Sequence, residues 1–133
     1  MADSVIPTNA GMAYITALIL ADNGVTGSPD WVGIGTGTTS PPERTETNLE
    51  TESAEDRVNG TASQQTTGTA QDTFRTVATV VAAGAQAVTE VGTFHTEAGV
   101  DMFLHAYFSA INLEIGNSIE FTIDTQFVPT AVP

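Results

Sequence analysis

Residues 104–127, LHAYFSAINLEIGNSIEFTIDTQF, alternate between apolar and polar side chains along two segments. In the second segment every other residue belongs to one series: Ile119, Phe121, Ile123, Thr125 and Phe127. Successive side chains of a β-strand point to opposite faces of its sheet, so this pattern predicts a strand with one apolar and one polar face. In the first segment the apolar series is Met102, Leu104, Ala106 and Phe108. The turn-forming residues 114–117 separate the two strands, whose apolar faces we expect the rest of the chain to cover.

Further short strands are predicted at residues 31–36, 72–81 and 87–95, with turn residues between them. Thr, Val and Gly are frequent, which favours strands and turns. We therefore predict one all-β domain over residues 1–133, an antiparallel, jelly-roll-like β-sandwich with one short N-terminal helix. Short links between successive strands favour an antiparallel meander in the C-terminal half.

The N-terminal part of the chain does not follow the strand pattern. Residues 1–9 form an arm, and apolar side chains at helical spacing predict a helix over residues 10–21. Asn9 is the expected N-cap, and Asn23-Gly24 is the expected end. Residues 43–71 are polar and acidic, and they predict a long excursion with a helical turn near residues 49–57.

The charge of the chain is strongly negative. Sixteen acidic residues stand against three arginines and no lysine, which gives a formal net charge of −13. A surface of this kind stays hydrated in concentrated salt, so we expect a salt-loving host. It lacks the basic footprint that nucleic-acid binding requires. There is no cysteine, and no apolar run has the length of a membrane span.

No catalytic or cofactor motif emerges from the sequence. The glycines of residues 33–37 lack the lysine of a phosphate-binding loop. His95 and His105 could bind a metal with nearby acids, but their spacing matches no metal motif. Ser109, His105 and Asp101 could form a triad only on paper, because no nucleophile elbow is present. We predict no enzymatic activity, no cofactor and no metal.

Structural roles are expected for the aromatic and basic residues. Trp31 is predicted to pack at a sheet edge. With so few bases among many acids, each arginine is expected in an ion pair within or between subunits. The residues predicted to contact other subunits or partners are Ile6, Pro7, Arg44, Leu49, Arg57 and Arg75.

Three segments together resemble a family of small virion proteins of tailed phages and archaeal tailed viruses. The likeness covers residues 31–57, 90–94 and 104–127. The matching residues are Gly35 to Thr39 (GTGTT), Pro41, Leu49, Glu52, Arg57, Glu90, Gly92, Phe94, Phe108, Gly116, Ile119 and Thr122. Thr93 stands where the family has an apolar residue, and Asn117 stands where it has Asp.

This resemblance implies a structural component of a virion, assembled in the cytoplasm of its host. With the acidic composition, it predicts a homo-oligomer, such as a trimer, that decorates the capsid of a haloarchaeal tailed virus and binds the major capsid protein. A tail component, such as a fibre or baseplate subunit, is the first alternative. A glycan-binding or enzymatic sandwich domain of a halophile is the second.

Overall fold

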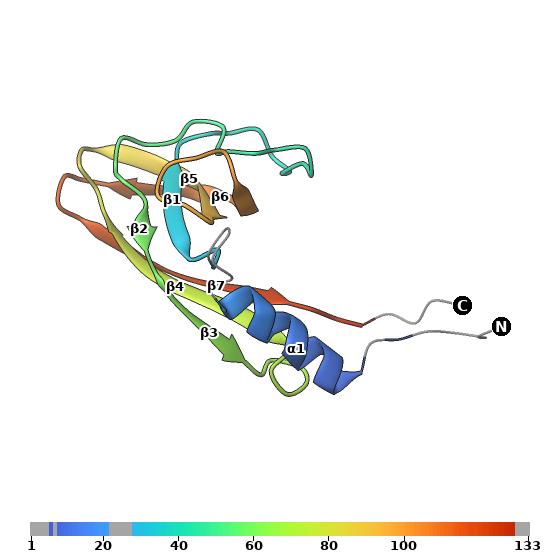
Figure 1. The fold of residues 1–133 in the computed structure, drawn as a ribbon. Coiled ribbons are helices and arrows are strands. Elements are labelled where there is room, and N and C mark those ends of the chain that lie inside the picture. The colour runs from blue at the N-terminus through green and yellow to red at the C-terminus, as the bar shows by residue number, and fades with distance from the viewer. Residues whose placement is uncertain (1–5, 7, 22–27, 130–133) are drawn as a thin grey trace.

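The protein is a sandwich of two antiparallel β-sheets with one helix (Figure 1). The computed structural model describes Ile6, residues 8–21 and residues 28–129. Sheet I has the strand order β2-β1-β5-β6, and sheet II has the order β3-β4-β7. The elements are α1 (Asn9–Leu20), β1 (Trp31–Gly35), β2 (Val58–Asn59), β3 (Thr61–Gln65), β4 (Thr73–Val81), β5 (Gln86–Phe94), β6 (Met102–Leu113) and β7 (Ser118–Gln126). The predicted all-β sandwich with an N-terminal helix is confirmed.

The core lies between the sheets and is built from alternate residues of the strands. Its buried side chains are Val32, Ile34, Ala78, Val80, Ala82, Val88, Val91 and Leu113. On β7, Ile119, Phe121 and Ile123 are half-buried against this core, while the residues between them are exposed. The alternation predicted for this strand is confirmed, and it exists because β7 turns one face to the core and the other to solvent.

The two strands of residues 104–127 do not share a layer. β6 pairs with β5 in sheet I, and β7 pairs with β4 in sheet II, so the predicted C-terminal meander is wrong. Residues 114–117 carry the chain across the core, and the two apolar faces cover each other. Phe108 and Phe121 meet there, with ring centroids 6.0 Å apart. A short link can join strands of two different sheets as well as neighbouring strands of one sheet. The tendency of successive strands to pair therefore does not decide the topology here.

The two crossings between the sheets brace each other. The amide of Ala82, in the link from β4 to β5, donates to the carbonyl of Asn117 at 2.8 Å. The amide of Gly116 donates to the carbonyl of Ala82 at 2.9 Å. Gly116 has a φ of +85°, a left-handed conformation in which a Cβ atom is unfavourable. Backbone hydrogen bonds therefore satisfy both links where they turn over the end of the core.

Helix α1 packs on β3 and β4, where sheet II extends beyond sheet I (Figure 1). Thr8, and not the predicted Asn9, caps it, because the Thr8 hydroxyl accepts from the Gly11 amide at 3.1 Å. Gln64 of β3 donates to the Ala13 carbonyl at 3.0 Å and to the Thr16 hydroxyl at 2.9 Å. The expected end at residues 23–24 lies outside the described residues. No helix in the described ranges is long and apolar enough to cross a bilayer.

The predicted acidic excursion of residues 43–71 is only partly a loop. It contains β2 and β3, which are edge strands of sheets I and II. Their sequences, VN and TASQQ, lack an apolar series because neither strand has a fully buried face. Residues 49–57 form no helix, since Glu52 instead bridges to Gly35 at the end of β1.

A buried carboxylate holds the connection from β3 to β4. Asp72 is 2% exposed and accepts from the amides of Gly68 and Thr69 at 3.2 and 3.0 Å. It also accepts from the side-chain amide of Gln126 at 2.9 Å. The Gln126 hydrogen bond and those of the loop amides hold the pKa of Asp72 well below its usual range. This loop is therefore ordered by one side chain that reaches two strands.

Phe74 couples the helix to the sheet, and its removal should weaken the whole domain. It is 2% exposed and lies opposite Gln64, so both side chains are on the face that carries α1. We expect Phe74→Ala to lower the free energy of unfolding by about 3–5 kcal/mol, because a large buried ring is replaced by a cavity. Chemical denaturation in concentrated salt measures this. The matched control is Val81→Ala on the same strand, where 56% of the residue is exposed and little change is expected. Equal losses in both variants would contradict the assignment.

Candidate functional site

The outer face of sheet I is covered by the chain itself. Gly33, Gly35 and Gly92 leave a strip of this face without side chains, since Gly33 pairs with Gly92 and Gly35 with Glu90. A Cβ atom on Gly92 would lie 3.0 Å from the side chain of Leu49, and one on Gly33 would lie 3.2 Å from that of Arg57. The glycines therefore make room for residues 36–57, hereafter the covering segment, to pack directly on the sheet.

Glu90 of β5 is the centre at which the covering segment is attached. Its side chain is fully buried, and its carboxylate accepts from three backbone amides. These donors are Gly37 at 2.7 Å, Glu50 at 2.9 Å and Thr51 at 2.9 Å. A buried carboxylate is costly unless it is hydrogen-bonded, and here both ends of the covering segment supply the donors. The Glu90 side chain thus fixes both the GTGTT turn and residues 50–51, where the covering segment comes back to the sheet.

His105 of β6 completes the environment of Glu90. Its Nε2 lies 2.8 Å from Glu90 Oε1, and its Nδ1 contacts Glu46 Oε2. Each ring nitrogen of His105 therefore faces a carboxylate oxygen. The His105 hydrogen bond holds the pKa of Glu46 below its usual range. His105 therefore ties the covering segment to both β5 and β6.

Arg57, the last residue of the covering segment, is a second point at which this segment is attached. It is 6% exposed, and its Nε donates to Glu52 at 2.9 Å. Its terminal nitrogens donate to Asn48 Oδ1 and to the carbonyls of Thr96 and Gly99. The guanidinium also lies over the ring of Phe94, 3.4 Å from the ring centroid. This planar fork serves several acceptors and a ring at once, which a lysine could not do.

The residues predicted to contact partners divide into two groups. Leu49 and Arg57 are buried within the subunit, and a partner contact at these two positions stays a prediction. Their side chains are used to hold the covering segment. Arg75 pairs with Asp124 across β4 and β7, with Nε to Oδ1 at 2.7 Å, and remains one-third exposed. Arg44 and Ile6 are exposed, and Pro7 lies outside the described residues.

The hypothetical catalytic and metal groups are not brought together. Both ring nitrogens of His105 face carboxylates, and Asp101 instead contacts the Thr96 hydroxyl and Arg57. His95 contacts the ring of Phe103 at a centroid distance of 6.1 Å. Within the described ranges, no group of three or more His, Cys, Asp or Glu side chains has the arrangement of a metal site. Trp31 lies at the end of β1, half-buried.

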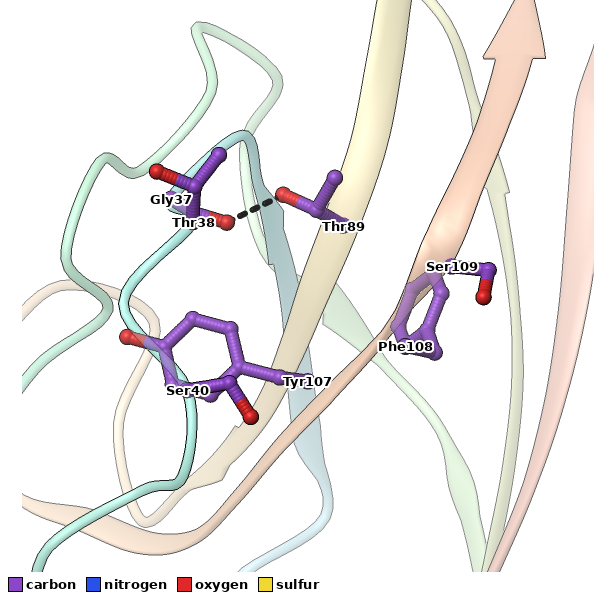
Figure 2. Close-up of a pocket in the computed structure, with 7 residues that line it drawn as sticks. All are labelled: Gly37, Thr38, Ser40, Thr89, Tyr107, Phe108 and Ser109. Carbon is purple, nitrogen blue, oxygen red and sulfur yellow. Dashed lines mark hydrogen bonds between the residues drawn. The ribbon is translucent and has the colours of Figure 1, made fainter.

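An open groove remains beside the covering segment, along the start of its GTGTT turn (Figure 2). Tyr107 of β6 stands in it, and its hydroxyl donates to Glu50 Oε2 at 3.0 Å. Burial, and then this contact with Glu50, raise the pKa of Tyr107. Hydrogen bonds from the amide and hydroxyl of Thr39 and from Tyr107 hold the pKa of Glu50 below its usual range. The groove is therefore lined by side chains whose positions are fixed.

Sequence reasoning missed Glu46, Glu50 and Tyr107 as members of this site. Their segments gave no signal of proximity, because Glu50 and Tyr107, which form a hydrogen bond, are 57 residues apart along the chain. A usable signal did exist at Glu90, since it is the only acidic residue of a strand whose neighbours are mostly apolar or small. An acid in such a strand implies dedicated hydrogen-bond donors.

Comparisons of this chain with models of protein families, with curated proteins and with solved structures give no match. Its function is therefore argued from its own residues.

The close approach at Gly35 gives a direct test of the covering segment. A Cβ atom there would lie 2.5 Å from the Thr51 carbonyl and 2.6 Å from Glu90 Oε2. We expect Gly35→Ala to lower the free energy of unfolding by about 1–3 kcal/mol, because the backbone must shift. Thermal or chemical unfolding measures it. At Gly84 nothing lies within 4 Å of the added atom, so Gly84→Ala is the matched control. The packing described would be refuted by a Gly35→Ala variant as stable as Gly84→Ala.

The two acceptor oxygens of Glu90 should matter more for the stability of the protein than the volume of its side chain. Glu90→Gln keeps the volume but replaces one acceptor oxygen by a donor, which must then face the amides of the covering segment or His105. We expect a loss of about 3 kcal/mol or more, as for a buried ion pair with one partner removed. Hydrogen exchange should show that the amides of Gly37, Glu50 and Thr51 lose protection. Glu120→Gln, at an exposed position of β7, is the control and should leave them unchanged.

Proposed function

We propose that this protein is a structural subunit of the virion of a haloarchaeal tailed virus and that it decorates the outer surface of the capsid. The observation that carries the proposal is the convergence of the residues on which the resemblance rests. Gly35, Gly37 and Glu90 form one contact, and Glu52, Arg57 and Phe94 form another. These residues come from segments far apart in the sequence, yet they serve a single purpose.

That purpose is mechanical. The matching residues of the covering segment and of β5 attach this segment to sheet I, and the side chains of Glu52, Arg57 and Glu90 are engaged in hydrogen bonds and ion pairs within the subunit. A pattern that preserves packing, not chemistry, is what a structural subunit needs. This supports a virion role over an enzymatic one, because an enzyme's recurring residues would include its reacting groups.

The exposed surface of α1 supports assembly with other subunits. The helix contains no charged residue, and after Asn9 at its first position its exposed residues are alanine, leucine and tyrosine. The exposed residues on this side are Ala10, Tyr14, Ala17, Leu18 and Ala21. Monomers rarely leave such a stripe uncovered, so we propose that it contacts copies of this chain or the major capsid protein.

Location on the virion is the decisive experiment. Purified virions should contain this chain in hundreds of copies, measured by quantitative mass spectrometry, and cryo-electron microscopy should place it on the capsid exterior. A few copies per particle at the tail would replace capsid decoration by the tail-component alternative. Absence from intact virions would refute both virion roles and leave the glycan-binding or enzymatic sandwich of a halophile.

Salt should stabilise the protein if its acidic surface is an adaptation to brine. The chain has three basic residues against sixteen acidic residues, and its formal net charge is −13. In molar salt the Debye length is about 3 Å, so repulsion between exposed carboxylates is screened. We expect the unfolding temperature to rise steadily with KCl, with loosening of oligomers below about 1 M. A protein equally stable in dilute buffer would argue against a halophilic host.

A further inference from the structure

The groove beside the GTGTT turn is the part of sheet I's outer face that the covering segment leaves open. One hollow of about 420 Å³ lies between this turn and β6, and a second of about 330 Å³ lies on the other side of Tyr107. Tyr107 lines both hollows, so they adjoin at this side chain. The size of each hollow is in the range of sites that hold small ligands.

The first hollow is lined by hydroxyl groups and aromatic rings. The hydroxyl side chains are those of Thr38, Ser40, Thr89 and Ser109, and Figure 2 shows them together with the rings of Tyr107 and Phe108. The Thr89 hydroxyl donates to the carbonyl of Gly37, as the dashed line marks. No charged side chain lines this hollow. A ligand here would have to offer many hydroxyl groups and an apolar face.

Tyr107 is held in place before any ligand arrives. Its hydroxyl donates to Glu50, which in turn accepts from the amide and the hydroxyl of Thr39 at 2.9 Å. One side of its ring contacts His105, with ring centroids 4.5 Å apart. A fixed ring loses little conformational entropy on binding, and its face attracts the C–H groups of a sugar ring through its quadrupole.

The acidic side chains of the second hollow restrict the charge that a ligand can carry. It is lined by the carboxylates of Glu43, Glu46 and Glu50 together with Thr39 and Asn48. Carboxylates accept strong hydrogen bonds from neutral hydroxyl groups. They repel phosphate, sulfate and uronate groups. Stacking and hydrogen bonding at short range also persist in brine, where attraction between distant charges is screened.

We infer that this groove binds a neutral saccharide, with a sugar ring stacked on Tyr107 and its hydroxyl groups bonded by the serine, threonine and glutamate side chains around it. The inference concerns the groove alone and does not depend on where the protein resides. On a virion it would attach the particle to neutral glycans of a host surface. On a cellular protein it would be a glycan-binding site.

The experiment is a titration of the full chain in concentrated KCl, followed by amide NMR. The probes are lactose, maltose and chitobiose, with galacturonic acid dimers as the charged counterpart. At least one neutral disaccharide should shift the amide signals of Gly37, Thr38 and Ser109, while the uronate shifts them at least tenfold less at equal concentration. The signals of the distant β3–β4 loop should stay unchanged.

Variants separate binding from folding. Tyr107→Ala should reduce affinity at least tenfold, whereas Tyr107→Phe keeps the ring and should retain most of the binding. Since Tyr107→Ala could fail to fold, Ser109→Ile provides a second test, because it fills the groove from an exposed strand position. Its matched control is Thr122→Ile, also exposed on a strand but in sheet II, where binding should be unaffected.

Three results would overturn the inference. The first is that no neutral disaccharide shifts these signals at its solubility limit. The second is that Ser109→Ile binds as well as Thr122→Ile. The third is that a lysine-rich peptide, and no sugar, binds at Glu43, Glu46 and Glu50, which would identify the groove as a site for a basic protein partner. None of these outcomes bears on copy number in virions, so the two proposals fail separately.

Discussion

The buried carboxylate of Glu90 is the interaction on which the arrangement of this molecule depends. It accepts from the amides of Gly37, Glu50 and Thr51, and it contacts His105. A carboxylate taken out of water needs such donors, and leaving it without them would cost several kcal/mol. The requirement is mutual, because the backbone amides at both ends of the covering segment are satisfied by the same group. A loop of polar sequence thereby becomes a third layer.

Arg57 gives this layer its second attachment. The guanidinium is buried between Glu52 and Phe94, and it donates to carbonyl groups in the connection from β5 to β6. Glu90 and Arg57 are separate attachment points of the covering segment, and each is surrounded by its own partners. Since both sites are shielded from solvent, salt screens them far less than it screens the acidic surface. The same molecule can therefore carry a repulsive exterior and firm internal ion pairs in brine.

The covering segment also explains where surface remains for recognition. It covers the glycine strip on the outer face of sheet I and leaves a groove between Tyr107 and the GTGTT turn. On sheet II, α1 covers one end of the inner face and turns an uncharged side outward. A rigid body with one groove and one apolar stripe has distinct places for a small ligand and for neighbouring subunits. Both arise from elements added to the sandwich, not from the sandwich itself.

The sequence by itself determined the class of the fold and the strands that carry apolar residues, but not the polar edge strands β2 and β3. Alternation at Ile119, Phe121 and Ile123 is a local property that depends only on the geometry of a strand and on one buried face. The partners of these strands were decided by tertiary structure, because a four-residue link such as residues 114–117 can turn within a sheet or cross to the other. The meeting of Glu90 with Gly37, His105 and Glu46 was likewise invisible in the sequence. It depends on the close packing of segments distant in the chain, and only the folded core sets which of them lie within hydrogen-bonding distance.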